Sequence, residues 1–171
     1  MKSDPANMTA AYGLPPCGRQ YASSTGKSSL FLLINRLKFS HYLAPGYRKV
    51  LGIDAEGPSI RSAMQNKKMN PGSSKTRFTA LRITAETVEQ LQLPINPESI
   101  LLDPPRKGPA EGVIAALCKR HPKKVLHIHC GVDQISDAVS QWQKGGYKVR
   151  RIVPLDMFPG SANLEILTLL T

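Results

Sequence analysis

The sequence predicts an α/β fold, in which a mostly parallel sheet is covered by helices on both faces and ends in an antiparallel hairpin. From residue 30 onward, short apolar runs alternate with stretches of helical spacing, as in chains that build parallel sheets. The last two apolar runs have no helix between them, which favours a hairpin at one sheet edge. The 171 residues are 41% hydrophobic, which is enough for one buried core without a metal or a disulfide.

Each predicted strand is a short apolar run. These runs are residues 30–34, 47–53, 76–81, 99–102, 124–129, 147–154 and 164–170. The helices are predicted over residues 57–70, 84–92, 109–120 and 134–144. Thr84 suits an N-cap, Pro109 suits a first helical turn, and Gly145-Gly146 ends the last helix.

The N-terminal residues 1–38 are predicted to form an irregular segment ahead of a domain of residues 39–171. The first 28 residues are rich in Gly, Pro, Ser and Thr and show no period. The change of character before Phe39 suggests a shifted reading frame upstream of that codon. We therefore expect an N-terminally incomplete sheet.

The charge indicates a polyanionic partner, because 23 Lys and Arg residues outweigh 12 Asp and Glu residues to give a net charge of +11. Nucleic acid and an anionic membrane surface are the two candidates, and plain solubility is the alternative. No apolar run reaches the length of a membrane span. Cys17, Cys118 and Cys130 are an odd number without CxxC spacing, so we expect reduced thiols in the cytoplasm and no structural metal.

Three polar residues stand at predicted strand ends, where open α/β sheets bind their ligands. They are Asp54, Asp103 and Cys130. Pro104-Pro105 stiffens the turn after Asp103, and such a rigid, acceptor-rich edge suits a flat base or the amine of a cofactor. Glu165 opens the last strand and could serve as a general base. The alternatives are a helix-capping role for the aspartates, a packing role for Cys130 and a solvated carboxylate at Glu165.

Two histidines precede Cys130 on the same predicted strand. Because side chains alternate along a strand, His127 and His129 would point away from the Cys130 side. This argues against a cysteine hydrolase that pairs Cys130 with either histidine. A metal site is not expected either, because the spacing suggests no third and fourth ligand.

Short motifs in the second half of the chain follow one another in a specific order. They are Asp103-Pro104-Pro105-Arg106-Lys107-Gly108, His129-Cys130-Gly131-Val132, Gly146-Tyr147, Asp156-Met157-Phe158-Pro159 and Asn163-Leu164-Glu165. Residues 39–171 thereby resemble the C-terminal catalytic part of the RNA uracil-5-methyltransferases that use S-adenosylmethionine. Members of that family read DPPRxG, SCNP, GY, DMFP and HVE in this order.

The resemblance implies a Rossmann-like class I methyltransferase sheet and transfer of a methyl group from S-adenosylmethionine to C5 of uracil in tRNA or rRNA. By the same resemblance, Cys130 matches the nucleophile and Glu165 matches the base that removes the C5 proton. Asp54 matches the acid that holds the cofactor ribose, and Asp103 matches the acid at the edge shared by cofactor and target base. RNA is the implied partner and the cytoplasm the implied location.

The chain also departs from the family pattern. Asn35 and Leu37 stand where the family has the glycines of its cofactor loop, and a Leu side chain would occupy the space that the backbone needs beside the cofactor. Gly131 and Val132 replace Asn-Pro, and Asn163 replaces His. We therefore expect weak cofactor binding and a chain that is truncated or inactive alone. The alternative function is a non-catalytic RNA-binding fragment.

Overall fold

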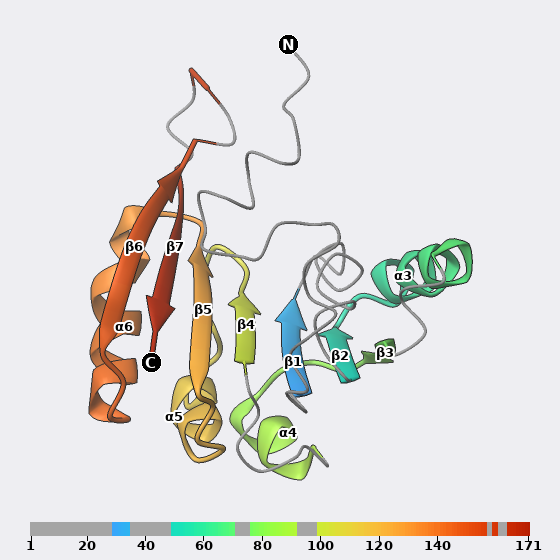
Figure 1. Cartoon of the computed structure of the whole chain (residues 1–171), viewed down its shortest axis with the longest axis horizontal. Coiled ribbons are helices and arrows are strands. Elements are labelled where there is room, and N and C mark those ends of the chain that lie inside the picture. The colour runs from blue at the N-terminus through green and yellow to red at the C-terminus, as the bar shows by residue number, and fades with distance from the viewer. Residues whose placement is uncertain (1–28, 35–48, 71–75, 92–98, 157–158, 161–163) are drawn as a thin grey trace, which may run out of the picture.

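The computed structural model describes residues 29–34, 49–70, 76–91, 99–156, 159–160 and 164–171, which build a seven-stranded sheet in the order β3-β2-β1-β4-β5-β7-β6. The strands are β1 (Ser29–Ile34), β2 (Lys49–Asp54), β3 (Thr76–Ala80), β4 (Ser99–Asp103), β5 (Lys124–His129), β6 (Val149–Leu155) and β7 (Glu165–Leu170). All neighbouring pairs are parallel except β5–β7 and β6–β7. Figure 1 shows β6 and β3 at the two edges and β7 running against its neighbours.

The predicted strands are all present, with small shifts at their ends, and the C-terminal hairpin is β6–β7. The expected N-terminal boundary needs a correction at residues 29–34. These residues were included in the irregular segment, yet they form β1, which pairs with β2 on one side and β4 on the other. The apolar run Leu30–Ile34 therefore outweighs the irregular composition that precedes it. The rest of residues 1–38 lies outside the described residues.

Helices cover both faces of the sheet. The helices α4 (Ala85–Gln90), α5 (Val113–Cys118) and α6 (Ile135–Lys144) share one core cluster with side chains of β2, β4, β5 and β7. On β2, Ile53 faces this cluster, so its neighbour Gly52 faces the other way. Phe78, which pairs with Gly52, packs with Ile60 and Ala63 of helix α3 (Gly57–Met69). Helix α3 therefore lies on the opposite face from α4, α5 and α6.

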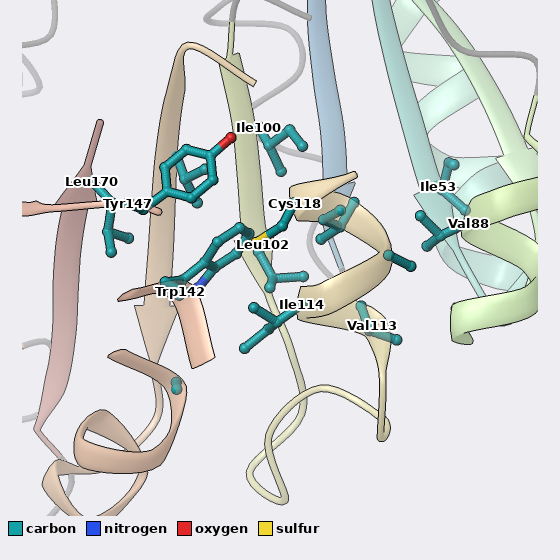
Figure 2. Close-up of a cluster of buried hydrophobic side chains, with 14 residues drawn as sticks. Ile53, Val88, Ile100, Leu102, Val113, Ile114, Cys118, Trp142, Tyr147 and Leu170 are labelled. Carbon is teal, nitrogen blue, oxygen red and sulfur yellow. The ribbon is translucent and has the colours of Figure 1, made fainter. Parts of the chain in front are cut away.

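The larger core cluster surrounds the buried indole of Trp142 (Figure 2). Its ring meets that of Tyr147 edge-on, with centroids 5.4 Å apart, and the Tyr147 hydroxyl donates to the Pro122 carbonyl at 2.8 Å. Burying one such side chain contributes about 2 kcal/mol or more to folding. A Cβ on Gly145 would lie 2.3 Å from Cys118 Sγ, which explains the glycine after α6.

Helix α5 begins later than predicted. Gly112 precedes it with φ of 75°, a left-handed conformation that an α-helix cannot contain. The helix therefore starts at Val113, and Pro109 belongs to the preceding turn. In contrast, the predicted cap at Thr84 is confirmed, because its hydroxyl accepts from the Thr87 backbone N–H at 3.2 Å.

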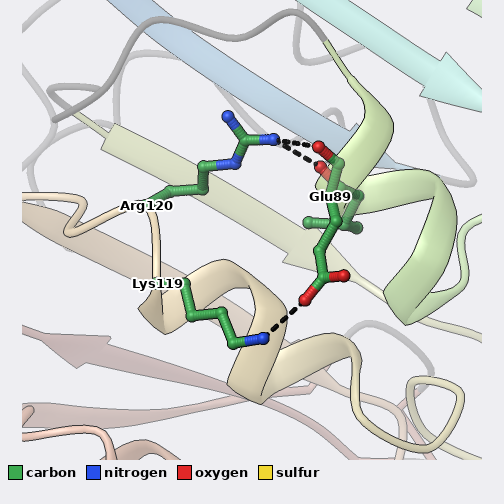
Figure 3. A network of polar contacts seen from close by, with 4 residues as sticks. Glu89, Lys119 and Arg120 are labelled. Carbon is green, nitrogen blue, oxygen red and sulfur yellow. Dashed lines mark hydrogen bonds and ion pairs between the residues drawn. The ribbon is translucent and has the colours of Figure 1, made fainter.

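Arg120, just after α5, closes the end of α4. Its Nη2 donates to the carbonyl oxygens of Val88, Glu89 and Leu91 at 2.9, 2.7 and 3.0 Å. Figure 3 shows the Arg120 guanidinium at the Glu89 carbonyl. These carbonyls at a helix end have few partners within the helix itself. Lys119 Nζ lies 2.6 Å from Glu89 Oε1 alongside them, in an exposed ion pair. None of the helices in the described residues is long and apolar enough to cross a membrane.

Candidate active site

The four residues singled out from the sequence all lie at the carboxyl edge of the parallel strands. Asp54 ends β2, Asp103 ends β4, Cys130 directly follows β5, and Glu165 opens β7. Because β7 is antiparallel to β5, its first residue lies beside the end of β5. Asp54 and Glu165 are 165 − 54 = 111 residues apart in the sequence, and the sheet places both at the same edge.

Cys130 and Glu165 occupy facing positions on neighbouring strands. His129 pairs with Ile166, so the next pair outward in this antiparallel register is Cys130 with Glu165. Side chains at such facing positions point to the same side, with Cβ atoms about 5 Å apart. Both residues are half-buried. The edge therefore presents a thiol and a carboxyl group to one small volume.

The two aspartates lie on the same face as this pair. Ile53 and Leu102 belong to the core under α4, α5 and α6, so Asp54 and Asp103 alternate to the opposite face. Strand β1 separates them: its residue Leu33 is in register with both Ile53 and Leu102. Asp54 and Asp103 are thus level with each other and two strands apart, about 10 Å.

Asp54 is buried with one carboxylate oxygen unused. Its Oδ1 accepts from the Glu56 backbone N–H at 2.9 Å, whereas Oδ2 has no hydrogen-bond partner among the described residues. Burial raises the pKa of the carboxyl group above its ordinary value. The side chain also makes no cap of α3, whose N-cap is Glu56. Asp54 therefore combines an exposed fraction of only 1% with an oxygen that has no partner among the described residues.

The turn after Asp103 is tied to the segment that carries Cys130. The Cys130 thiol donates to the carbonyl oxygen of buried Pro104, with Sγ and O 3.7 Å apart. The Gln134 side-chain amide donates to the Arg106 carbonyl oxygen. Gly108 closes the turn with φ of 78°, and its N–H donates to the Pro105 carbonyl at 2.8 Å. The expected stiff edge is therefore present, and it lies against the thiol.

The two histidines of β5 lie on the other face, away from Cys130. His127 and His129 are buried with ring centroids 4.0 Å apart, and Trp142 Nε1 donates to His127 Nδ1 at 3.1 Å. His127 Nδ1 is therefore the unprotonated nitrogen and Nε2 carries the hydrogen, so Nε2 cannot bind a metal in this state. Burial lowers the pKa of His127 and brings that of His129 to about 4. The described residues contain no group of metal ligands.

Sequence reasoning missed two parts of this edge. The Pro104 carbonyl and the Gln134 amide join the turn after β4 to the segment after β5. A backbone carbonyl leaves no signal in a sequence, and Gln134 reads only as a polar residue at a helix start. Asn35, Leu37 and Asn163 lie outside the described residues.

The sheet order, with an antiparallel β7 inserted between β5 and β6 and acids after β2 and β4, defines the class I methyltransferase fold. Solved structures confirm this class. A tRNA (uracil-54, C5)-methyltransferase from Pyrococcus abyssi, solved with S-adenosyl-L-homocysteine, superposes with a TM-score of 0.67 at 21% identity, over 85% of this chain and 35% of that one. The N-methyltransferase NodS from Bradyrhizobium japonicum superposes with a TM-score of 0.65 at 14% identity, over 88% of this chain and 89% of that one.

The curated relatives that match the chain are named RNA methyltransferases. An uncharacterized RNA methyltransferase of Clostridium acetobutylicum is 28% identical over 152 residues, 88% of this chain and 33% of the relative. One from Staphylococcus aureus is 31% identical over 129 residues, 75% of this chain and 28% of the relative. No family model matches the chain. The chain is thus a relative of the RNA methyltransferases, as its motifs indicate, and it spans about a third of the length of these relatives.

Proposed function

We propose that this chain forms the catalytic sheet of an enzyme that transfers a methyl group from S-adenosylmethionine to C5 of uracil in RNA. The observation that carries the proposal is the placement of Cys130, directly after β5, beside Glu165, the first residue of β7, on the same sheet face and edge as Asp54 and Asp103. The Pyrococcus neighbour, a tRNA uracil methyltransferase, and the RNA methyltransferase relatives support it. Whether the substrate is tRNA or rRNA is to be decided by the methylation experiment described below.

The residues at this edge fit the cofactor. Asp54 Oδ2 is a buried acceptor with no hydrogen-bond partner among the described residues, and its place at the end of β2 suits the ribose hydroxyls of a nucleoside. Asp103, two strands away, would accept from the amine of the cofactor or from the edge of the target base. S-adenosylmethionine supplies a methyl group bound to a positively charged sulfur. The chain must then make uracil C5 nucleophilic enough to accept it.

Cys130 meets that need by covalent catalysis. As a thiolate, its Sγ forms a bond to uracil C6, and the electron pair of the C5–C6 double bond moves toward C5 and O4. C5 would then form the new bond to the methyl carbon while the bond between that carbon and the cofactor sulfur breaks, so that the electron pair stays on sulfur and S-adenosylhomocysteine leaves. Glu165 removes the remaining hydrogen of C5 as a proton, the C5–C6 double bond re-forms, and the C6–S bond breaks to release the thiolate. The target base must leave its stack to reach Cys130.

The first test measures 5-methyluridine by mass spectrometry after the chain is incubated with S-adenosylmethionine and RNA. The Cys130→Ala variant is expected to lose at least a thousandfold in rate, because the covalent route is removed. Cys118→Ala is the matched control, since Cys118 is buried in the core under the helices and should retain activity. Methylation that persists in Cys130→Ala would remove the proposed nucleophile.

A second test traps the covalent bond. In RNA that carries 5-fluorouridine, C5 bears fluorine in place of the hydrogen that Glu165 removes, and fluorine does not leave as a cation. The C6–S bond should therefore persist, and the chain should migrate with the RNA in a denaturing gel. Failure of Cys130→Ala to form this product, with Cys118→Ala unaffected, would locate the bond at Cys130.

RNA binding without catalysis is the second candidate, favoured by the net charge of +11. Binding by charge alone weakens steeply with salt and produces no methylated base. A chain that binds RNA in this manner but yields neither 5-methyluridine nor the trapped product is a binding fragment.

A further inference from the structure

A row of cations crosses β5, β7 and β6 at the strand ends that lie farthest from Cys130. Lys124 opens β5 and Lys148 precedes β6, and both stand level with Thr171. The backbones of Lys148 and Thr171 exchange hydrogen bonds of 2.9 and 3.1 Å, and Arg150 Nε donates to Thr171 Oγ1 at 2.7 Å. Arg151, which pairs with Leu169, extends the row. We call Lys124, Lys148, Arg150 and Arg151 the basic row.

Lys124, Lys148 and Arg151 of the basic row lie on the same sheet face as the candidate active site, Arg151 because it pairs with Leu169, the neighbour of the core residue Leu170. Val125 and Leu170 are buried in the core under α5 and α6, and Val149 packs against that core. Their neighbours Lys124, Thr171 and Lys148 therefore alternate to the opposite face, which is the face of Cys130 and Glu165. Cys130 is six residues beyond Lys124, so the two lie about 20 Å apart along the strand.

The row is exposed and strongly positive. All four side chains are exposed, β5 and β6 contain no Asp or Glu, and the one acid of β7 is Glu165 at its far end. The four side chains together carry a charge of +4. Such a surface attracts an extended polyanion more strongly than a single small anion.

Edge protection accounts for only part of the row. Lys and Arg on an outermost strand such as β6 prevent pairing with another sheet. Lys124, however, belongs to β5, which is paired with β4 and β7 on its two sides. A cation there, level with Lys148 across β7, protects no edge.

We propose that the basic row binds the phosphates of RNA that flanks the target uridine. Its distance from Cys130, about 20 Å, is too long for the phosphate of the target nucleotide and suits neighbouring nucleotides of the same RNA. The proposal rests on the proposed function for the identity of the polyanion as RNA. It assigns a second RNA contact to the sheet face that bears the active site.

The test compares two triple variants by fluorescence anisotropy with a labelled RNA hairpin and with a uridine trinucleotide. The first carries Lys124→Gln, Lys148→Gln and Arg151→Gln, and leaves Arg150 in its bond to Thr171. The control carries Arg61→Gln, Lys68→Gln and Arg77→Gln, which are exposed residues of α3 and β3 at the other end of the sheet. Both variants lose the same charge.

The first variant should bind the hairpin roughly tenfold more weakly at low salt. The slope of log affinity against log salt concentration should become shallower by about 2, because three phosphate contacts are lost. Its affinity for the trinucleotide and the affinities of the control should not change. Equal losses in both variants, unchanged hairpin binding, or self-association of the first variant with intact RNA binding would overturn the proposal. If the first variant shows the expected change of slope but the unmodified chain methylates no RNA, the proposed function is rejected and the basic row remains an RNA contact.

Discussion

At the scale of single residues, Asp54 shows a conflict between stability and binding. Burial raises the pKa of its carboxyl group, so the charged form costs folding free energy at neutral pH. Its Oδ2, at the end of β2, has no hydrogen-bond partner among the described residues. This combination is what the proposed contact between Asp54 and the cofactor predicts.

The Asp54→Asn variant separates these two effects. We expect its affinity for S-adenosylmethionine, measured by calorimetry, to fall at least tenfold, since hydrogen bonds to a charged acceptor are worth about 1.5–3 kcal/mol. Its melting temperature should stay the same or rise, because the buried charge is removed. Glu56→Gln is the control, as its exposed side chain lies next to the site and its backbone N–H still donates to Asp54. A variant that loses stability and keeps affinity would contradict this assignment.

At the scale of elements, short helices depend on caps supplied by their neighbours. Helix α4 has six residues and would be unstable alone. Thr84 closes its first turn, and Arg120 closes its last from the far end of α5. The sequence predicted the cap at Thr84, because capping residues lie next to the helix that they serve. It could not predict Arg120, which is 29 residues from Leu91.

The Arg120→Met variant tests this cap. Met retains much of the apolar stem and removes the guanidinium, so three carbonyl oxygens lose their donor. We expect the free energy of unfolding in urea to fall by about 1–3 kcal/mol. Lys119→Met is the control, and its loss should stay below about 1 kcal/mol because the Lys119–Glu89 pair is exposed. Equal effects of the two variants would show that Arg120 acts only as surface charge.

The histidine pair of β5 predicts how the fold responds to acid. The pKa of His129 falls from 6.5 in the unfolded chain to about 4 in the folded chain, so between these values the unfolded state binds more protons. The stabilising contribution is therefore complete above pH 6.5 and is lost as the pH falls toward 4, up to about 3 kcal/mol. The pKa of His127 shifts in the same direction.

Urea unfolding at several pH values checks this expectation. In His129→Gln the loss of stability between pH 6.5 and 4 should become smaller. His121→Gln is the control, because His121 is exposed. An acid response that is unchanged in His129→Gln would exclude this residue as its source.

At the scale of the whole molecule, the sequence predicted the sheet and helices well, whereas the roles of the four candidate site residues stay predictions. Strand β5, with its short apolar run, and the Asp-Pro-Pro turn after β4 could be predicted because their signals are local. The facing of Cys130 and Glu165 was not, because it depends on the register between β5 and β7. The apolar residues 30–34 were predicted as a strand, but the boundary drawn at residue 38 placed them outside the domain to which β1 belongs.

The central position of β1 has a consequence for any attempt to work with part of this chain. Among the described strands, β1 is the only hydrogen-bonded link between the pair β3-β2 and the group β4-β5-β7-β6. A fragment that starts at Phe39 keeps the motifs of residues 103–165 that carry the family resemblance and still loses the strand that joins Asp54 to the other three candidate residues. Without β1, Asp54 and Cys130 would lie on two pieces of sheet that share no hydrogen bonds.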